Sequence, residues 1–98
     1  MTRADILKEA EKCVCGQRQD DYGSPEDNFK TIANLWTAYL DASDPAISHI
    51  ITPKDVAVMM ALLKVARIAR GDNPDSFVDL AGYAACAGEI AAYLRGEA

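Results

Sequence analysis

The sequence has few of the residues that build disulfide frameworks, zinc sites or catalytic triads. It contains three cysteines and one histidine in 98 residues. Cys13 and Cys15 are spaced CxC, but no second pair completes a zinc ligand set, and Cys86 stands alone. His49 has no serine, cysteine or aspartate partner at a recognisable spacing, so a nucleophilic triad is not indicated. We therefore expect the cysteines to be small buried thiols in a reducing cytoplasm.

Targeting and membrane-spanning segments are also missing from the pattern. The N-terminal stretch MTRADILKEAEK has neither the long apolar core nor the cleavage site of a signal peptide. No run reaches the roughly 20 uninterrupted apolar residues of a membrane span. The sequence therefore predicts a cytoplasmic protein.

The chain lacks the excess of positive charge that duplex DNA or RNA requires. Ten Lys and Arg residues stand against fifteen Asp and Glu residues, which gives a formal net charge of −5. Phosphate backbones demand a basic footprint, so duplex nucleic acid is excluded as a partner. A small phosphorylated ligand is not excluded, because one local pair of cations can bind an anion within an acidic protein.

The length allows one domain, residues 1–98. A chain this short buries only about 60–65% of its unfolded surface, yet half of its residues are hydrophobic. The surplus apolar surface must be buried against another molecule, and a second copy of the same chain is the simplest partner. We therefore expect a homo-oligomer.

Capping residues and prolines predict four helices. Ser24, Thr52 and Asn73 each precede a proline, which suits the first position of a helix. Asp5 and Asp55 follow threonine caps at the spacing of a capping box. No run alternates with the period of a strand, so the fold class is all-α, a compact bundle of about four helices. The predicted helices span 3–15, 25–41, 53–70 and 75–95, with Gly16 and Gly71 as C-terminal caps.

The third of these helices carries the first candidate site. It is apolar on nearly every side, as buried helices are, yet it carries Lys64 and Arg67 one turn apart. The short turn that follows brings the last helix back alongside, with Asp79 and Tyr83 on one face. Two interpretations remain open. Either Lys64 or Arg67 forms an interhelical salt bridge with Asp79, or the two cations bind a phosphate while Tyr83 contacts a base.

The second candidate site is the segment DYGSPEDN, residues 21–28. Loops held against a rigid scaffold often carry ligand contacts, and Asn28 could read the edge of a base. The alternative is a turn followed by a helix cap. The sequence predicts no catalytic residue and no metal ligand. The predicted ligand-binding residues are Tyr22, Asn28, Lys64, Arg67, Asp79 and Tyr83.

Three spaced motifs cover most of the chain. The first, YG-x-P-x-x-N-F, runs from Tyr22 to Phe29 and precedes a helix that carries Trp36. The second, DV-x-x-M-x-x-x-x-K-x-x-R, runs from Asp55 to Arg67, and the third, DS-x-x-D-x-x-G-Y, from Asp75 to Tyr83. Together they resemble a family of small phage and prophage proteins of unknown function. The resemblance implies a phage or prophage origin, and thus the host bacterial cytoplasm, without implying an established activity.

The helical layout is also similar, more distantly, to the all-α nucleotide pyrophosphohydrolases of the MazG-like group. Those enzymes hold magnesium with an E-x-x-E helix and an E-x-x-D helix. This chain has no E-x-x-E, and Asp55 stands alone on its helix. The pattern therefore does not favour an enzyme, and magnesium would be a cofactor only of a degenerate hydrolase.

Three functions are compatible with these patterns. The first is a homo-oligomeric binding protein that sequesters a nucleotide-like phosphorylated ligand, which for a phage could be a host immune second messenger. The second is a protein–protein interaction module built from the apolar helices. The third is a nucleotide hydrolase with a degenerate metal site.

Overall fold

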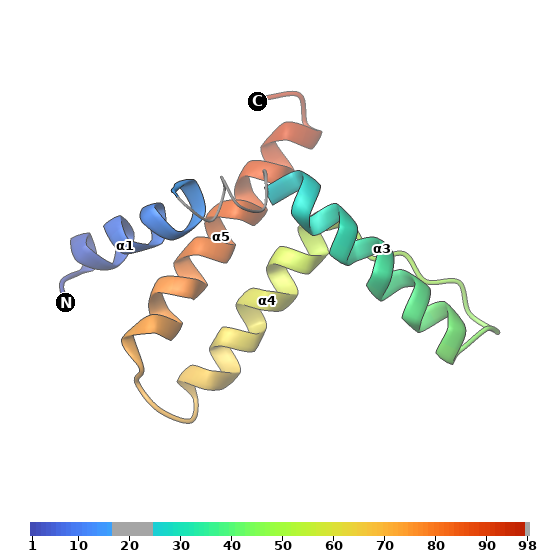
Figure 1. Cartoon of the computed structure of the whole chain (residues 1–98), viewed down its shortest axis with the longest axis horizontal. Coiled ribbons are helices and arrows are strands. Elements are labelled where there is room, and N and C mark those ends of the chain that lie inside the picture. Colours follow the sequence, from blue (N-terminus) through green and yellow to red (C-terminus); the bar gives the residue numbers. More distant parts are fainter. Residues whose placement is uncertain (17–24, 98) are drawn as a thin grey trace.

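The computed structural model describes residues 1–16 and 25–97, and this part of the chain is helical without strands. The four predicted helices are confirmed, and each begins within one residue of its predicted start. In chain order they are α1 (Arg3–Cys15), α3 (Pro25–Ser43), α4 (Pro53–Ile68) and α5 (Pro74–Leu94) (Figure 1).

Hydrogen-bonded caps explain where three of the helices begin. In α1 the Asp5 N–H donates to Thr2 Oγ1 at 3.2 Å, and the Thr2 N–H donates to Asp5 Oδ2 at 2.9 Å. The backbone hydrogen bond from Thr2 lowers the pKa of Asp5. Thr52 and Asp55 form the same capping box at the start of α4. Asn73 caps α5, while Ser24, the predicted cap of α3, lies outside the described residues.

The end of α4 differs from the prediction. The helix ends at Ile68, and its C-cap is Ala69 rather than Gly71. The last turn has the tighter hydrogen-bond spacing of a 3₁₀-helix. The Arg70 N–H donates to the Arg67 carbonyl at 3.0 Å, and the Gly71 N–H donates to the Ile68 carbonyl at 3.2 Å. These three-residue hydrogen bonds satisfy the last helical carbonyls without a glycine cap.

Helices α4 and α5 run antiparallel and make the most extensive contact in the molecule (Figure 1). Helix α1 packs on α5, while α3 contacts α4 and diverges from the rest. The described core is therefore small and lies where α3 meets the other two helices. Its buried residues are Phe29, Ala33, Val56, Ala57, Cys86 and Ile90.

The bundle is less compact than the sequence predicts. Its radius of gyration is 14.8 Å, against about 12.5 Å for a typical domain of this length. The reason is the position of α3, whose C-terminal half extends away from α5 (Figure 1). Among the described residues, nothing consequently covers one side of α4, although its apolar composition predicts a buried helix.

Gly82 allows α1 to approach α5 closely. A Cβ added at this position would lie 3.1 Å from Val14 Cγ1, closer than ordinary van der Waals contact. This close helix contact is internal to the chain. Gly88, on the same helix, has nothing within 4 Å of its added Cβ.

These two glycines provide a matched test of that packing. We expect Gly88→Ala to raise the free energy of unfolding by about 0.5–1 kcal/mol, because alanine favours a helix interior over glycine. Gly82→Ala should fall about 1 kcal/mol or more below Gly88→Ala, because its methyl group meets Val14. Urea denaturation followed by circular dichroism measures both. Equal gains would show that α1 does not depend on this approach.

The cysteines follow the prediction only in part. Cys86 is buried in the core, as expected. Cys13 and Cys15 are exposed, because α1 buries little of its own surface against α5. The expectation that all three thiols are buried is wrong for this pair.

Helix α5 is the one described helix long and apolar enough, by length and composition alone, to cross a membrane. Asp75, Asp79 and Glu89 interrupt its apolar sequence. The helix packs against both α1 and α4.

Candidate functional site

An ion pair joins the two central helices at the first predicted site. Lys64 Nζ on α4 lies 2.9 Å from Asp79 Oδ2 on α5. The Lys64 side chain is 12% exposed and the Asp79 side chain 38% exposed. The predicted interhelical salt bridge is therefore present, and it holds the lysine ammonium at the edge of the packed region.

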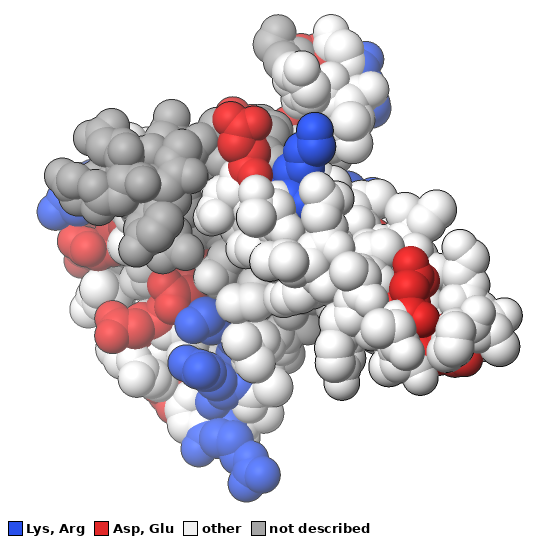
Figure 2. Space-filling model, turned by 45° about the vertical axis from the view of Figure 1, so that its right-hand side comes forward, with Lys and Arg blue, Asp and Glu red and all other residues white. Residues whose placement is uncertain are grey.

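Two arginines continue the positive charge beyond this pair. Arg67 and Arg70 are exposed, and neither forms an ion pair with any residue in the described ranges. Figure 2 shows Lys and Arg side chains gathered towards the lower end of the molecule, where Figure 1 places the turn between α4 and α5. We refer to Lys64, Arg67 and Arg70 as the cationic row.

Tyr83 lies on the other side of the ion pair from Arg67. Because α4 and α5 are antiparallel, Arg67 is displaced from Lys64 towards the turn, and Tyr83 is displaced from Asp79 away from it. The Tyr83 ring packs against Phe29, with ring centroids 6.2 Å apart. Its ring thus belongs to the edge of the core, and a phosphate at Arg67 would lie away from it.

The remaining predicted residues do not join this cluster. Asn28 is half-buried in the first turns of α3, next to Phe29 in the sequence. Tyr22 lies outside the described residues. The structure therefore brings Lys64 and Asp79 together, places Arg67 one turn along α4, and leaves Asn28 and Tyr83 near the core.

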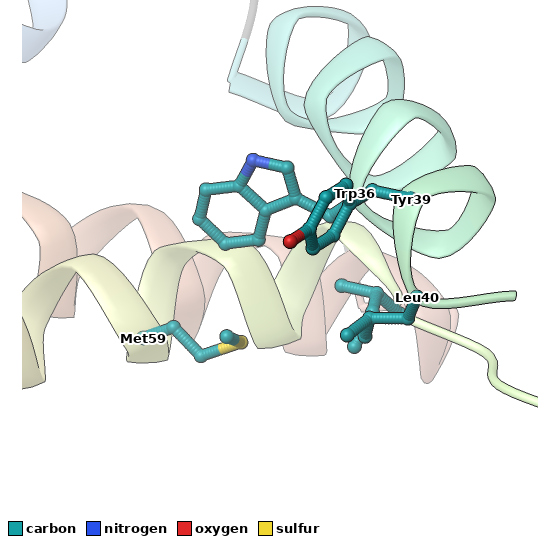
Figure 3. Close-up of a pocket in the computed structure, with 5 residues that line it drawn as sticks. Trp36, Tyr39, Leu40 and Met59 are labelled. Atoms are coloured by element: carbon teal, nitrogen blue, oxygen red, sulfur yellow. The ribbon is translucent and has the colours of Figure 1, made fainter. Parts of the chain in front are cut away.

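An apolar hollow between α3 and α4 was not predicted. Its volume is about 500 Å³. Figure 3 shows Trp36 and Tyr39 on α3 facing it, with Met59 on α4 across from them. The full lining is Trp36, Tyr39, Leu40, Ile51 and Met59. None of these side chains is charged, so the hollow suits apolar groups rather than a phosphate.

A histidine–aspartate pair was also missed. His49 Nδ1 lies 3.0 Å from Asp41 Oδ1, and the His49 N–H donates to the same oxygen at 2.9 Å. The Ile51 N–H donates to Thr37 Oγ1 at 2.9 Å. These bonds hold the segment before α4 against the end of α3. They give His49 a structural role that a motif search for triads does not detect.

The His49–Asp41 pair predicts that the stability of the fold depends on pH. Hydrogen bonds from the His49 side chain and backbone lower the pKa of Asp41 below its ordinary value of 3.8. A lowered folded-state pKa adds stability that is present above the ordinary value and is lost as the pH falls through the folded value. We expect Asp41→Asn to remove this part of the acid sensitivity. Carboxyl NMR titration of Asp41 measures it, and a pKa at or above 3.8 would contradict the contact.

The acidic residues of the described chain do not gather into a metal site. Within residues 1–16 and 25–97, no three His, Cys, Asp or Glu side chains form a group that could hold a metal ion. Asp55, the acid singled out for the hydrolase alternative, accepts the Thr52 N–H at 3.0 Å in a capping box. Its carboxylate therefore caps the N-terminus of α4.

A comparison with models of known protein families identifies the family of this chain. Residues 5–91 match the model of a family described as "Domain of unknown function (DUF6378)". The chain belongs to this family. The predicted membership in a family of unknown function is thus confirmed, and the similarity in layout to MazG-like enzymes stays a prediction.

Two relatives in this comparison come from bacteriophages. The "Gene 55 protein" of Mycobacterium phage D29 is 43% identical over 86 residues, which cover 87% of this chain and 52% of the relative. The "Gene 55 protein" of Mycobacterium phage L5 is 48% identical over 80 residues, covering 81% and 47%. The chain spans about half the length of these relatives. No solved structure matches. These similarities support the conclusion that the chain is a phage protein of unknown function.

Proposed function

We propose that the chain binds a phosphorylated, nucleotide-like small molecule at the cationic row. One observation supports this function above all. A protein with a net charge of −5 presents two exposed arginines beside a lysine that an aspartate holds in place, and neither arginine pairs with a described carboxylate. Asp79 neutralises one charge of the row, so the row keeps an excess of positive charge.

The chemistry of the row fits a phosphate group. Arg67 and Arg70 carry planar guanidinium groups, each of which can donate two parallel hydrogen bonds to a phosphate. Lys64 contributes a point charge whose position is fixed by Asp79. A ligand with two or more phosphates would engage more of the row than inorganic phosphate does. For a phage protein, the proposed ligands are host signalling nucleotides such as cyclic dinucleotides or cyclic ADP-ribose derivatives.

A thermal-shift measurement across a nucleotide panel tests this function. A ligand at 100 times its Kd stabilises the folded state by about 2.7 kcal/mol. In a domain of this size each kcal/mol raises Tm by about 4–8 °C. We expect at least one phosphorylated nucleotide to raise Tm, while the corresponding nucleoside does not. A panel without any shift at millimolar concentration would overturn the proposal.

The apolar hollow favours a second candidate, a protein–protein interaction module. Its lining of Trp36, Tyr39, Leu40, Ile51 and Met59 contains no charge, which is typical of the centre of a protein interface. This candidate predicts no response to nucleotides.

A further inference from the structure

Helix α4 has two apolar sides, and the part of the chain that the structure describes covers only one of them. Val56 and Ala57 are completely buried against the other helices. At 100° per residue, Val58, Leu62 and Val65 lie on the opposite side of the helix. These three side chains are 43%, 61% and 47% exposed. The exposed stripe accounts for the all-round apolar character of α4 in the sequence.

The stripe continues into the hollow on α3. Met59, which borders the stripe on α4, also lines the hollow with Trp36 and Tyr39 (Figure 3). Tyr39 itself is 71% exposed. We name this continuous surface the outer apolar face. Its members are Trp36, Tyr39 and Leu40 on α3 and Val58, Met59, Leu62 and Val65 on α4.

The accessible surface of the chain is larger than one folded monomer requires. It measures 6807 Å², against about 5,500 Å² for a typical monomer of 10.6 kDa. The excess is about 1,300 Å², and homodimers that bury more than about 2,000 Å² in total remove about 1,000 Å² or more from each chain. The excess thus matches what one chain contributes to a stable dimer.

We propose that a second copy of the chain covers the outer apolar face in a two-fold dimer. A two-fold interface uses the same patch on both subunits, so that patch must present projecting side chains as well as a recess. Leu62 and Tyr39 are exposed and project, and Tyr39 also lines the recess, the hollow of about 500 Å³. The face carries no charge, so two chains that are each at −5 can meet there without like charges in contact.

The mass of the protein in solution tests the dimer. We expect the dimer to dissociate with a Kd of about 1 μM or less. Sedimentation equilibrium at about 100 μM should therefore give a mass of about 21 kDa, twice the 10.6 kDa of one chain. Leu62→Glu should give a monomer, because two carboxylates would be buried at the centre of the interface. Leu62 is 61% exposed in the single chain, so the variant should keep its helical circular dichroism. Trp36, the one tryptophan, reports the same step by a red shift of its emission on dilution.

Leu7→Glu is the matched control. Leu7 is 64% exposed, on α1, outside the outer apolar face, and this variant should keep the dimer mass. A wild-type mass of one chain at this concentration would overturn the proposal. So would a Leu62→Glu dimer, or dissociation by Leu7→Glu alone, because the contact would then use another surface. Nucleotide binding is measured separately, so failure of the dimer is distinguishable from failure of the proposed ligand site.

Discussion

Val56→Asp is expected to unfold the chain. Val56 is 0% exposed, and its neighbours in the core are apolar. An aspartate there must be buried without a partner, which costs about 4 kcal/mol or more. A small domain has a total stability of about 5–15 kcal/mol, and a chain with so few buried residues is expected at the low end. Far-UV circular dichroism and thermal denaturation measure the loss.

Val58→Asp is the matched variant two residues along the same helix. The Val58 side chain is 43% exposed on the uncovered side of α4, so a carboxylate there stays hydrated within one chain. We expect the helical signal to survive while the dimer mass is lost. Unfolding by both substitutions would show that the two sides of α4 are equally buried, and would contradict the account of this helix.

Arg67→Ala is expected to weaken nucleotide binding about 10- to 100-fold with little change in stability. The Arg67 side chain is exposed and forms no ion pair with a described residue, so its removal should cost the fold little. A hydrogen bond from a charged group to a ligand contributes about 1.5–3 kcal/mol, which corresponds to that loss in Kd. Isothermal titration with the nucleotide that raises Tm measures the change. Arg3→Ala removes an exposed arginine from α1 and should leave Kd unchanged.

Lys64→Ala should combine a binding defect with a loss of stability. The substitution leaves the partly buried Asp79 carboxylate without its partner, which we expect to cost about 1–2 kcal/mol. Lys64→Met with Asp79→Leu removes both charges and should recover most of the stability but not the binding. Recovery of binding in the double variant would show that the ion pair is structural and that the ligand binds elsewhere.

The local features of the fold were predictable because their causes are local. A threonine or asparagine cap followed by proline fixes a helix start within a few residues, as Thr52 and Asn73 do, and the capping box of Thr2 with Asp5 does the same for α1. The proximity of Lys64 and Arg67 to Asp79 followed from one short turn, which forces two helices to run antiparallel, but the turn alone did not decide which cation forms the ion pair. Membership of the family could also be inferred from the sequence, because the family motifs depend only on residue identity and spacing.

The features that were missed depend on the path of the whole chain. The sequence showed that α4 is apolar on all sides, but the angle at which α3 leaves the bundle decides which side is covered. The contact of Tyr83 with Phe29 depends on the same angle. The His49–Asp41 pair closes across an irregular segment, where no helical period relates the two residues.

Retention and release of a nucleotide panel by the wild-type protein tests the proposed function most directly. Excess protein is mixed with the panel and magnesium and then ultrafiltered, and the retained fraction is heated. We predict that one phosphorylated nucleotide is missing from the filtrate and appears intact after heating. An unchanged panel would contradict the ligand site and leave Lys64 as a structural cation. A new product would contradict sequestration and direct attention to the carboxylates as catalytic groups.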